Sequence, residues 1–93
     1  MFLLQYLLLA VLSTGCTHDG VRLSGKVQVV EQFPDIKVKV VKHNPDLKVR
    51  FVKHFPNECG EWQEVKNFPD FRVQYVDHFP DITIKIVEEF PGR

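Results

Sequence analysis

The chain has 93 residues, of which 44% are hydrophobic and 26% charged, as expected for one small domain. Twelve basic residues balance twelve acidic ones, and this zero net charge argues against a general nucleic-acid binder, which gains affinity from excess Lys and Arg. The two cysteines, Cys16 and Cys59, are too few for the disulfide-dense framework of many small secreted domains. Most of the stability must therefore come from another source.

The N-terminal segment predicts an export signal over residues 1–16, followed by a single domain over residues 17–93. Residues 1–12 are apolar except for Gln5, and the stretch is too short for a permanent membrane-spanning helix, which takes about 20 residues. Its length suits the apolar core of a signal peptide. We therefore expect export, either to the cell envelope, lipid-anchored or periplasmic, or out of the cell.

The residues that lead to Cys16 are small, and the run Ser13-Thr14-Gly15-Cys16 resembles the lipobox of bacterial lipoproteins. The resemblance implies lipidation of Cys16 and membrane attachment through the N-terminus. Two features depart from the motif, because Leu12 lies four residues before the cysteine rather than three and no Lys or Arg precedes the apolar stretch. The alternatives are ordinary cleavage near Gly15 and an apolar arm that is retained.

Proline recurs along the rest of the chain at a nearly fixed interval. The six prolines stand at positions 34, 45, 56, 69, 80 and 91, so the spacings are 11, 11, 13, 11 and 11 residues. The units cover residues 33–43, 44–54, 55–67, 68–78 and 79–89, after a degenerate first unit at 22–32. A proline in every unit would break a helix each time, so the repeat predicts strands.

Apolar residues alternate within each unit, as in Ile36, Val38 and Val40, and most are β-branched or aromatic. The alternation fails at one fixed place, at pairs such as Val40-Val41, which predicts a β-bulge or a bend. Phe-Pro-Asp predicts a turn in which Asp bonds its own backbone. No Asn-Gly or Gly-Gly stands at these joints, so two-residue hairpins are not expected. The pattern suits a meander, a small barrel or a solenoid.

Tandem units of the form F-P-D-[ILF]-[KRT]-[VI]-x-[VIFY]-V-x-H resemble the septoil-knot domain family, small bacterial β-proteins whose chain winds into a seven-crossing knot. The likeness covers residues 21–93. It implies an all-β fold, in which about six 11-residue repeats are wound into a compact, closed and knotted β-domain that unfolds slowly. The unit at 55–67 departs from the pattern, because it is two residues longer, has Asn57 in place of Asp, and has Glu64 at an apolar position.

Basic side chains occupy the outward strand positions, whereas acidic ones gather at the turns and at the ends of units. The predicted anion-binding residues are Lys37, Lys39, Lys48, Arg50, Arg72 and Lys85. This segregation indicates a β surface for lipid head groups or acidic polysaccharide. The alternative is that the strand Lys and Arg residues prevent aggregation while the Asp residues serve the turns.

His43, His54 and His78 occupy the same place in their units, so the fold would stack them if equivalent positions align. Three imidazoles suit zinc or copper, but no Cys or carboxylate completes a ligand spacing, and a packing or turn role is the alternative. We expect no metal and no other cofactor.

The irregular unit contains the only tryptophan, Trp62. We expect it in the core, at the position of Val38 and Val49, with Gly60 absorbing the insertion. An exposed Trp62 that anchors a partner is the alternative. Cys59 has no partner if Cys16 is lipidated, and otherwise a bridge between the two cysteines is possible.

No glycine-rich phosphate loop, metalloprotease signature or Ser-His-Asp arrangement occurs in the sequence. We therefore expect a non-enzymatic, exported structural or interaction protein with a mechanically or proteolytically robust domain. We expect a monomer with an unidentified protein or envelope partner and no nucleic-acid partner. The alternative function is a binding module for anionic envelope components, which would use the basic strand faces.

Overall fold

The computed structural model describes residues 16–93, and every regular element in them is a β-strand. A short hairpin comes first, formed by β1 (Thr17–His18) and β2 (Val21–Arg22). Six strands follow: β3 (Gly25–Val29), β4 (Ile36–Val40), β5 (Leu47–Phe51), β6 (Glu61–Glu64), β7 (Phe71–Tyr75) and β8 (Ile82–Ile86). Each repeat unit thus contributes one strand, as the alternating pattern predicted.

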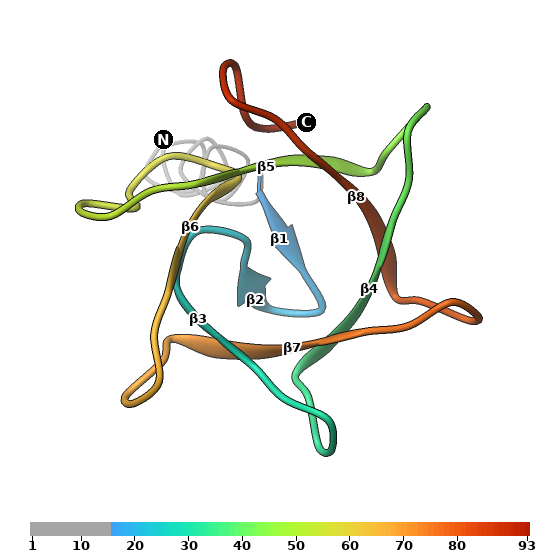
Figure 1. Cartoon of the computed structure of the whole chain (residues 1–93), viewed down its shortest axis with the longest axis horizontal. Helices are drawn as coiled ribbons and strands as arrows, with labels where there is room; N and C mark the ends of the chain where they lie inside the picture. Colours follow the sequence, from blue (N-terminus) through green and yellow to red (C-terminus); the bar gives the residue numbers. More distant parts are fainter. Residues whose placement is uncertain (1–15) are drawn as a thin grey trace, which may run out of the picture.

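The six strands close into a barrel with the order β3-β6-β5-β8-β4-β7 (Figure 1). Every pairing in the barrel is parallel, and β7 returns to β3 to complete the ring. Closure leaves no strand edge open to pairing with another chain. The prediction of a closed all-β domain is confirmed.

Successive strands of the chain occupy places in this ring at a regular spacing. Each connection between regular units advances the chain by two places, because one other strand lies between β3 and β4, between β4 and β5, and likewise later. Steps of two in a ring of six would return the chain to the place of β3 after three steps. The longer unit advances by a single place, from β5 to β6, so that β6, β7 and β8 fill the gaps between β3, β4 and β5. The unit with the two-residue insertion therefore determines which places in the ring β6, β7 and β8 occupy.

Short loops join these parallel strands, although such strands ordinarily need a crossover of a dozen or more residues. The register explains why six residues are enough. Val40 at the end of β4 and Leu47 at the start of β5 both pair with Ile84 in the middle of β8. The connection therefore passes over one strand, and both of its ends lie at the level of the same residue of that strand. The same relation holds around Val73, Val27 and Val38.

The core is built from the first and third residues of the strands. The third residues of the five-residue strands are Val27, Val38, Val49, Val73 and Ile84, and all five are fully buried. The fifth residues have the same inward parity but lie at the end of the barrel, so Val40 and Ile86 are half-exposed. Each unit therefore buries fewer side chains than the alternation suggested.

The paired apolar residues mark the ends of strands and not a bulge within them. β4 ends at Val40, and the Val41 amide that follows still donates a hydrogen bond of 2.8 Å to the Ile84 carbonyl. The equivalent valines, Val52, Val76 and Val87, make the same bond to their neighbouring strands. The alternation fails because the strand leaves the barrel at this point.

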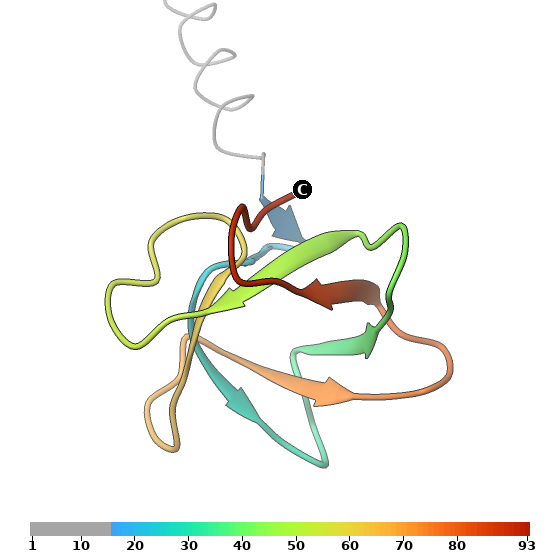
Figure 2. The same cartoon turned by 45° about the horizontal axis from the view of Figure 1, so that its top comes forward.

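The N-terminal hairpin lies across one end of the barrel (Figure 2). Cys16 forms a disulfide with Cys59 of the irregular unit, and the Leu23 amide donates to the Cys16 carbonyl at 3.0 Å. The C-terminal Arg93 donates to the Thr17 carbonyl at 3.0 Å. The hairpin is thus bound both to the irregular unit, through Cys59, and to the C-terminal residue Arg93.

Candidate binding surfaces

Each turn aspartate binds the backbone of a neighbouring strand. The Asp81 amide donates to the Lys37 carbonyl at 2.8 Å, and an Asp81 carboxylate oxygen accepts from the Lys37 amide at 2.7 Å. The same reciprocal pair joins Asp35 to Arg72, Asp46 to Thr83 and Asp70 to Lys26. We call these four pairs the aspartate clamps. The predicted bond from Asp to its own local backbone is wrong, because each carboxylate accepts from the amide of a strand that is distant in the sequence.

The chain end supplies a related contact. Gly92 stands where the other units have Asp, and its amide and carbonyl exchange hydrogen bonds of 2.9 and 2.8 Å with Lys48 of β5. A backbone carbonyl here replaces the carboxylate as the acceptor. The second residues of five barrel strands are therefore bound in this way.

Basic side chains project from the outer face of the barrel. The residues are Lys26, Lys37, Lys39, Lys48, Arg50, Arg72 and Lys85, which we call the basic wall. All are exposed except Lys39, which is partly buried. Within residues 16–93 the one ion pair joins His18 to Asp19 at 3.4 Å, so no wall residue is paired with a carboxylate.

The barrel order gathers the predicted anion-binding residues. Lys48 and Arg50 lie on β5, Lys85 on β8, and Lys37 and Lys39 on β4, and these three strands are consecutive in the ring. Lys48 and Lys85 are directly opposite each other. Arg72 lies on β7, the next strand after β4. Residues far apart in the sequence thus come together on the outer face, where the neutral Gln74 and Thr83 are the partners in register of Lys37 and Lys39.

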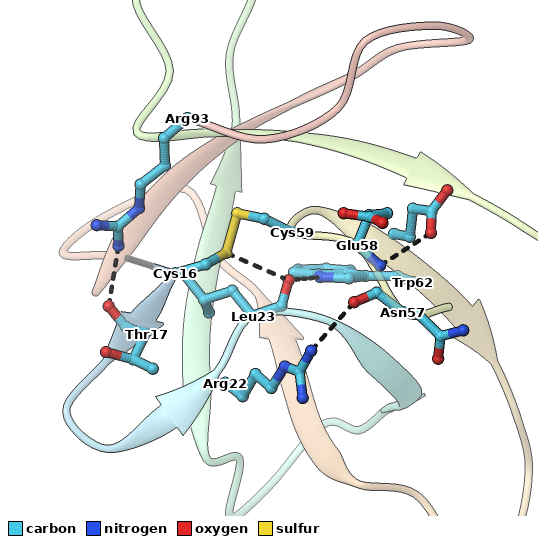
Figure 3. Close-up of a disulfide and its surroundings, with 10 residues drawn as sticks. Cys16, Thr17, Arg22, Leu23, Asn57, Glu58, Cys59, Trp62 and Arg93 are labelled. Atoms are coloured by element: carbon cyan, nitrogen blue, oxygen red, sulfur yellow. Dashed lines mark hydrogen bonds between the residues drawn. A yellow bond between two sulfur atoms is a disulfide. The ribbon is translucent and has the colours of Figure 1, made fainter. Parts of the chain in front are cut away.

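The irregular unit places its tryptophan inside the barrel, as expected. Trp62 is fully buried, and its indole Nε1 donates to the Leu23 carbonyl at 3.2 Å (Figure 3). Its ring packs edge-on against Phe71, with centroids 5.6 Å apart, and against Phe51 at 6.2 Å. Trp62 pairs in register with Gly25, so the largest side chain of the core faces the smallest residue. The alternative of an exposed Trp anchor is excluded.

Sequence reasoning missed the most exposed apolar side chains of the chain. The phenylalanines of the Phe-Pro turns are Phe33, Phe55, Phe68, Phe79 and Phe90, and each is 80–93% exposed. Their φ angles are 56–58°, in the left-handed region that bulky residues rarely adopt, at a cost of about 1–2 kcal/mol each. They stand on loops that project outward around the barrel (Figure 1). The fixed spacing of Phe before Pro was the signal, but it did not indicate whether the ring was buried.

A comparison with protein-family models matches residues 20–93 to the 7(1) septoil knot domain. The chain belongs to the septoil knot domain family. The match covers the whole barrel and agrees with the likeness carried by the Phe-Pro-Asp units. No curated protein matches the chain. In the described part of this septoil knot domain, no helix is long and apolar enough to cross a membrane.

The histidines of the septoil knot domain do not stack. His43, His54 and His78 are exposed and stand on three different loops. Across residues 16–93, no three His, Cys, Asp or Glu side chains gather closely enough to hold a metal ion. Two of the rings instead lie beside the next residue, His54 with Phe55 at 6.2 Å and His78 with Phe79 at 6.5 Å. The expected alignment of equivalent positions fails because each loop points in its own direction.

The cysteine arrangement bears on the lipidation prediction. A sulfur atom in a disulfide cannot also carry a thioether-linked lipid, so the Cys16–Cys59 bond and a lipidated Cys16 are mutually exclusive. The proposed signal peptide precedes this bond and, for residues 1–15, lies outside the described residues. Lipidation of Cys16 therefore stays a prediction, and the disulfide with Cys59 is its alternative.

One titratable side chain has a shifted pKa. Tyr75, the last residue of β7, is partly buried, and burial raises the pKa of its phenol above 10.0. The negative charge of Glu64 raises it further. The neutral phenol therefore persists to a higher pH than in an exposed tyrosine.

Proposed function

We propose that this septoil knot domain is an exported, non-enzymatic interaction domain that binds anionic polymers of the cell envelope through its basic wall. The observation that supports this most is the concentration of five unpaired basic side chains on β5, β8 and β4. The turn aspartates accept from backbone amides in the aspartate clamps, and no carboxylate in residues 16–93 forms an ion pair with a side chain of the wall. Unpaired basic side chains thus gather on the outer faces of three strands, although the net charge is zero. A polyanion would contact several strands of one rigid surface.

Export is supported by the cysteines as well as by the apolar N-terminus. Disulfides form and persist in oxidising compartments and are rare in the cytosol. The Cys16–Cys59 bond joins the start of the domain to its irregular unit. We therefore favour a form that is released from its signal and retains this bond over the lipidated form.

A structural role is the second candidate, and the closed ring favours it. The barrel has no free edge, and the aspartate clamps join neighbouring strands. With the knotted path that the family description implies, such a domain would resist unfolding and proteolysis in a harsh environment. Both roles are compatible with one molecule.

The wall can be tested with heparin, a soluble acidic polysaccharide, and the full chain purified as the cell exports it. Reversing Lys48 and Lys85 together, as Lys48→Glu with Lys85→Glu, should raise the Kd by about tenfold or more, because two neighbouring cations become anions. The matched control is Lys53→Glu with Lys66→Glu, which makes the same change in net charge on the loops. It should raise the Kd by less than about threefold.

Two results would contradict the proposal. Equal losses in both variants would mean that heparin responds to net charge and not to the wall. Absence of binding by the unaltered protein at low salt would exclude the wall as a polyanion site. Isothermal calorimetry at two salt concentrations measures both quantities.

A further inference from the structure

The phenylalanine loops differ in the charge that stands two residues before the ring. Lys53 precedes Phe55, and Lys66 precedes Phe68. An acid holds this place in the other three loops that carry phenylalanine: Glu31 before Phe33, Asp77 before Phe79 and Glu88 before Phe90. We call the first pair of loops the basic tips and the last two, with Phe79 and Phe90, the acidic tips. The repeat thus presents the same ring in two electrostatic settings.

The basic tips precede and follow the short strand β6 and are adjacent around the ring (Figure 1). The loops at 52–60 and 65–70 lie on the same side of the barrel in both views (Figures 1 and 2). Both are held in place: the Arg22 guanidinium donates to the Asn57 carbonyl at 3.1 Å, and the Gln28 amide donates to the Lys66 carbonyl at 2.9 Å. The Cys16–Cys59 bond also ties the first loop to the hairpin. Phe55 and Phe68 are thereby presented on supported loops.

Neither folding nor backbone geometry accounts for these rings. Phe55 and Phe68 are 80% and 91% exposed and bury little of their surface against the chain. Their left-handed φ angles of 56° favour Asn or Gly. Asn44 occupies the same repeat position with a φ of 53°, so the fold accepts Asn there. Packing within the described chain therefore does not explain the phenylalanines.

The shape of the tips indicates which kind of surface they would contact. A single ring at the end of a projecting loop meets a flat, rigid protein surface on one side only. The interface of a bilayer closes around each ring separately, and a nearby Lys keeps its ammonium among the head groups while its stem lies along apolar material. Anionic head groups attract Lys and repel Asp and Glu. Each basic tip carries one Lys beside its ring and one acid farther along the loop, Glu58 or Asp70, whereas each acidic tip carries two acids and no Lys. The basic tips therefore fit such a surface better than the acidic tips.

We propose that the basic tips insert Phe55 and Phe68 into the interface of an anionic lipid bilayer, with Lys53 and Lys66 at the phosphate level. This contact goes beyond the polyanion site, because it uses two loop ends and not the outer faces of β5, β8 and β4. It turns the β6 side of the barrel toward the lipid, whereas β4, which lies opposite β6 in the ring, faces away from it.

The test is co-sedimentation of the full, exported, disulfide-bonded chain with vesicles of phosphatidylcholine alone or mixed with phosphatidylglycerol. The chain should bind the mixed vesicles more tightly. Phe55→Asn with Phe68→Asn should lower the partition coefficient by about tenfold or more, since two buried rings are lost. Phe79→Asn with Phe90→Asn is the matched control, with the same residue change, turn and φ, and should lower it by less than about twofold. Asn44 indicates that both variants fold, which circular dichroism checks.

A single reporter separates insertion from attraction by charge. The emission that Phe68→Trp adds to that of the buried Trp62 should shift to the blue on the mixed vesicles and be quenched by brominated lipid, whereas the emission added by Phe79→Trp should do neither. The unaltered chain gives the emission of Trp62 alone. Equal losses from the two Asn pairs, or equal binding to neutral and anionic vesicles, would overturn the proposal. So would absence of binding to both. Heparin binding by the Phe55 and Phe68 variant should be unchanged, which keeps this result independent of the basic wall.

Discussion

A side chain at one turn of this protein completes the hydrogen bonding of a strand that lies far away in the sequence. Asp70 accepts from the Lys26 amide at 2.8 Å and donates its own amide to the Lys26 carbonyl at 2.7 Å. The clamp leaves no room beside Gly25, where a Cβ would collide with the Asp70 carboxylate. Gly25 also has a φ of 127°, which only glycine adopts readily. One small residue thus makes room for the clamp.

Replacing this glycine tests the clamp. Gly25→Ala should lower the free energy of unfolding by about 2–4 kcal/mol, because the methyl group displaces the carboxylate and strains the backbone. Gly20→Ala is the control, since Gly20 also has a positive φ, of 82°, but no atom within 4 Å of the added carbon. It should cost about 1 kcal/mol. Denaturant titration measures both, and equal losses would show that the clamp contributes nothing.

The unusual element of the fold is the long connection between β5 and β6. Every other connection between barrel strands advances the chain by two places, and this one advances it by one. The unit looked defective in the sequence, with two extra residues and an Asn in place of Asp. Its irregularity is what keeps the second turn of the chain from meeting the first.

Deletion of Asn57 and Glu58 restores the regular length of this unit and keeps Cys59, Gly60 and Trp62. We expect the deletion to abolish cooperative folding, because a step of two places would direct β6 to the position that β3 already fills. Asn57→Ala with Glu58→Ala is the control. It keeps the length of the unit and changes only exposed side chains, so it should cost less than about 1 kcal/mol. Thermal melting followed by circular dichroism distinguishes the deletion variant from the control. A deletion variant that melts like the native chain would show that the length of this unit does not determine the place of β6.

At the scale of the whole molecule, the winding and the disulfide are separate sources of stability. The disulfide spans a sequence separation of 43 residues, for which loop closure in the unfolded chain is worth about 4 kcal/mol. We expect the winding to act on rates, because a knotted path would have to be unthreaded for the chain to open. The family description implies that this path is a knot.

The two sources separate in the variant Cys16→Ser with Cys59→Ser. It should lose about 2–4 kcal/mol of equilibrium stability but still unfold in denaturant on the order of hours. Unfolding is followed by the fluorescence of Trp62, which leaves its buried site when the barrel opens. Unfolding of the variant within a second would mean that the disulfide, and not the winding, slows the process.

The sequence alone determined the strands and their inward residues, because period-2 alternation and a proline in every unit depend only on neighbouring residues. The repeat by itself suited a meander, a barrel or a solenoid, and the expectation of a closed domain came from the resemblance to the septoil knot family. The sequence also predicted that Trp62 is buried and which basic residues point outward. Only the tertiary structure decided that every barrel pairing is parallel, that Lys48 meets Lys85, and that the Asp residues bind distant strands. These features depend on which strands become neighbours, and a repeated unit contains no information about its place in the ring. The burial of a Phe beside a Pro likewise depends on whether anything stands opposite the loop, and in this protein nothing in the described chain covers those rings.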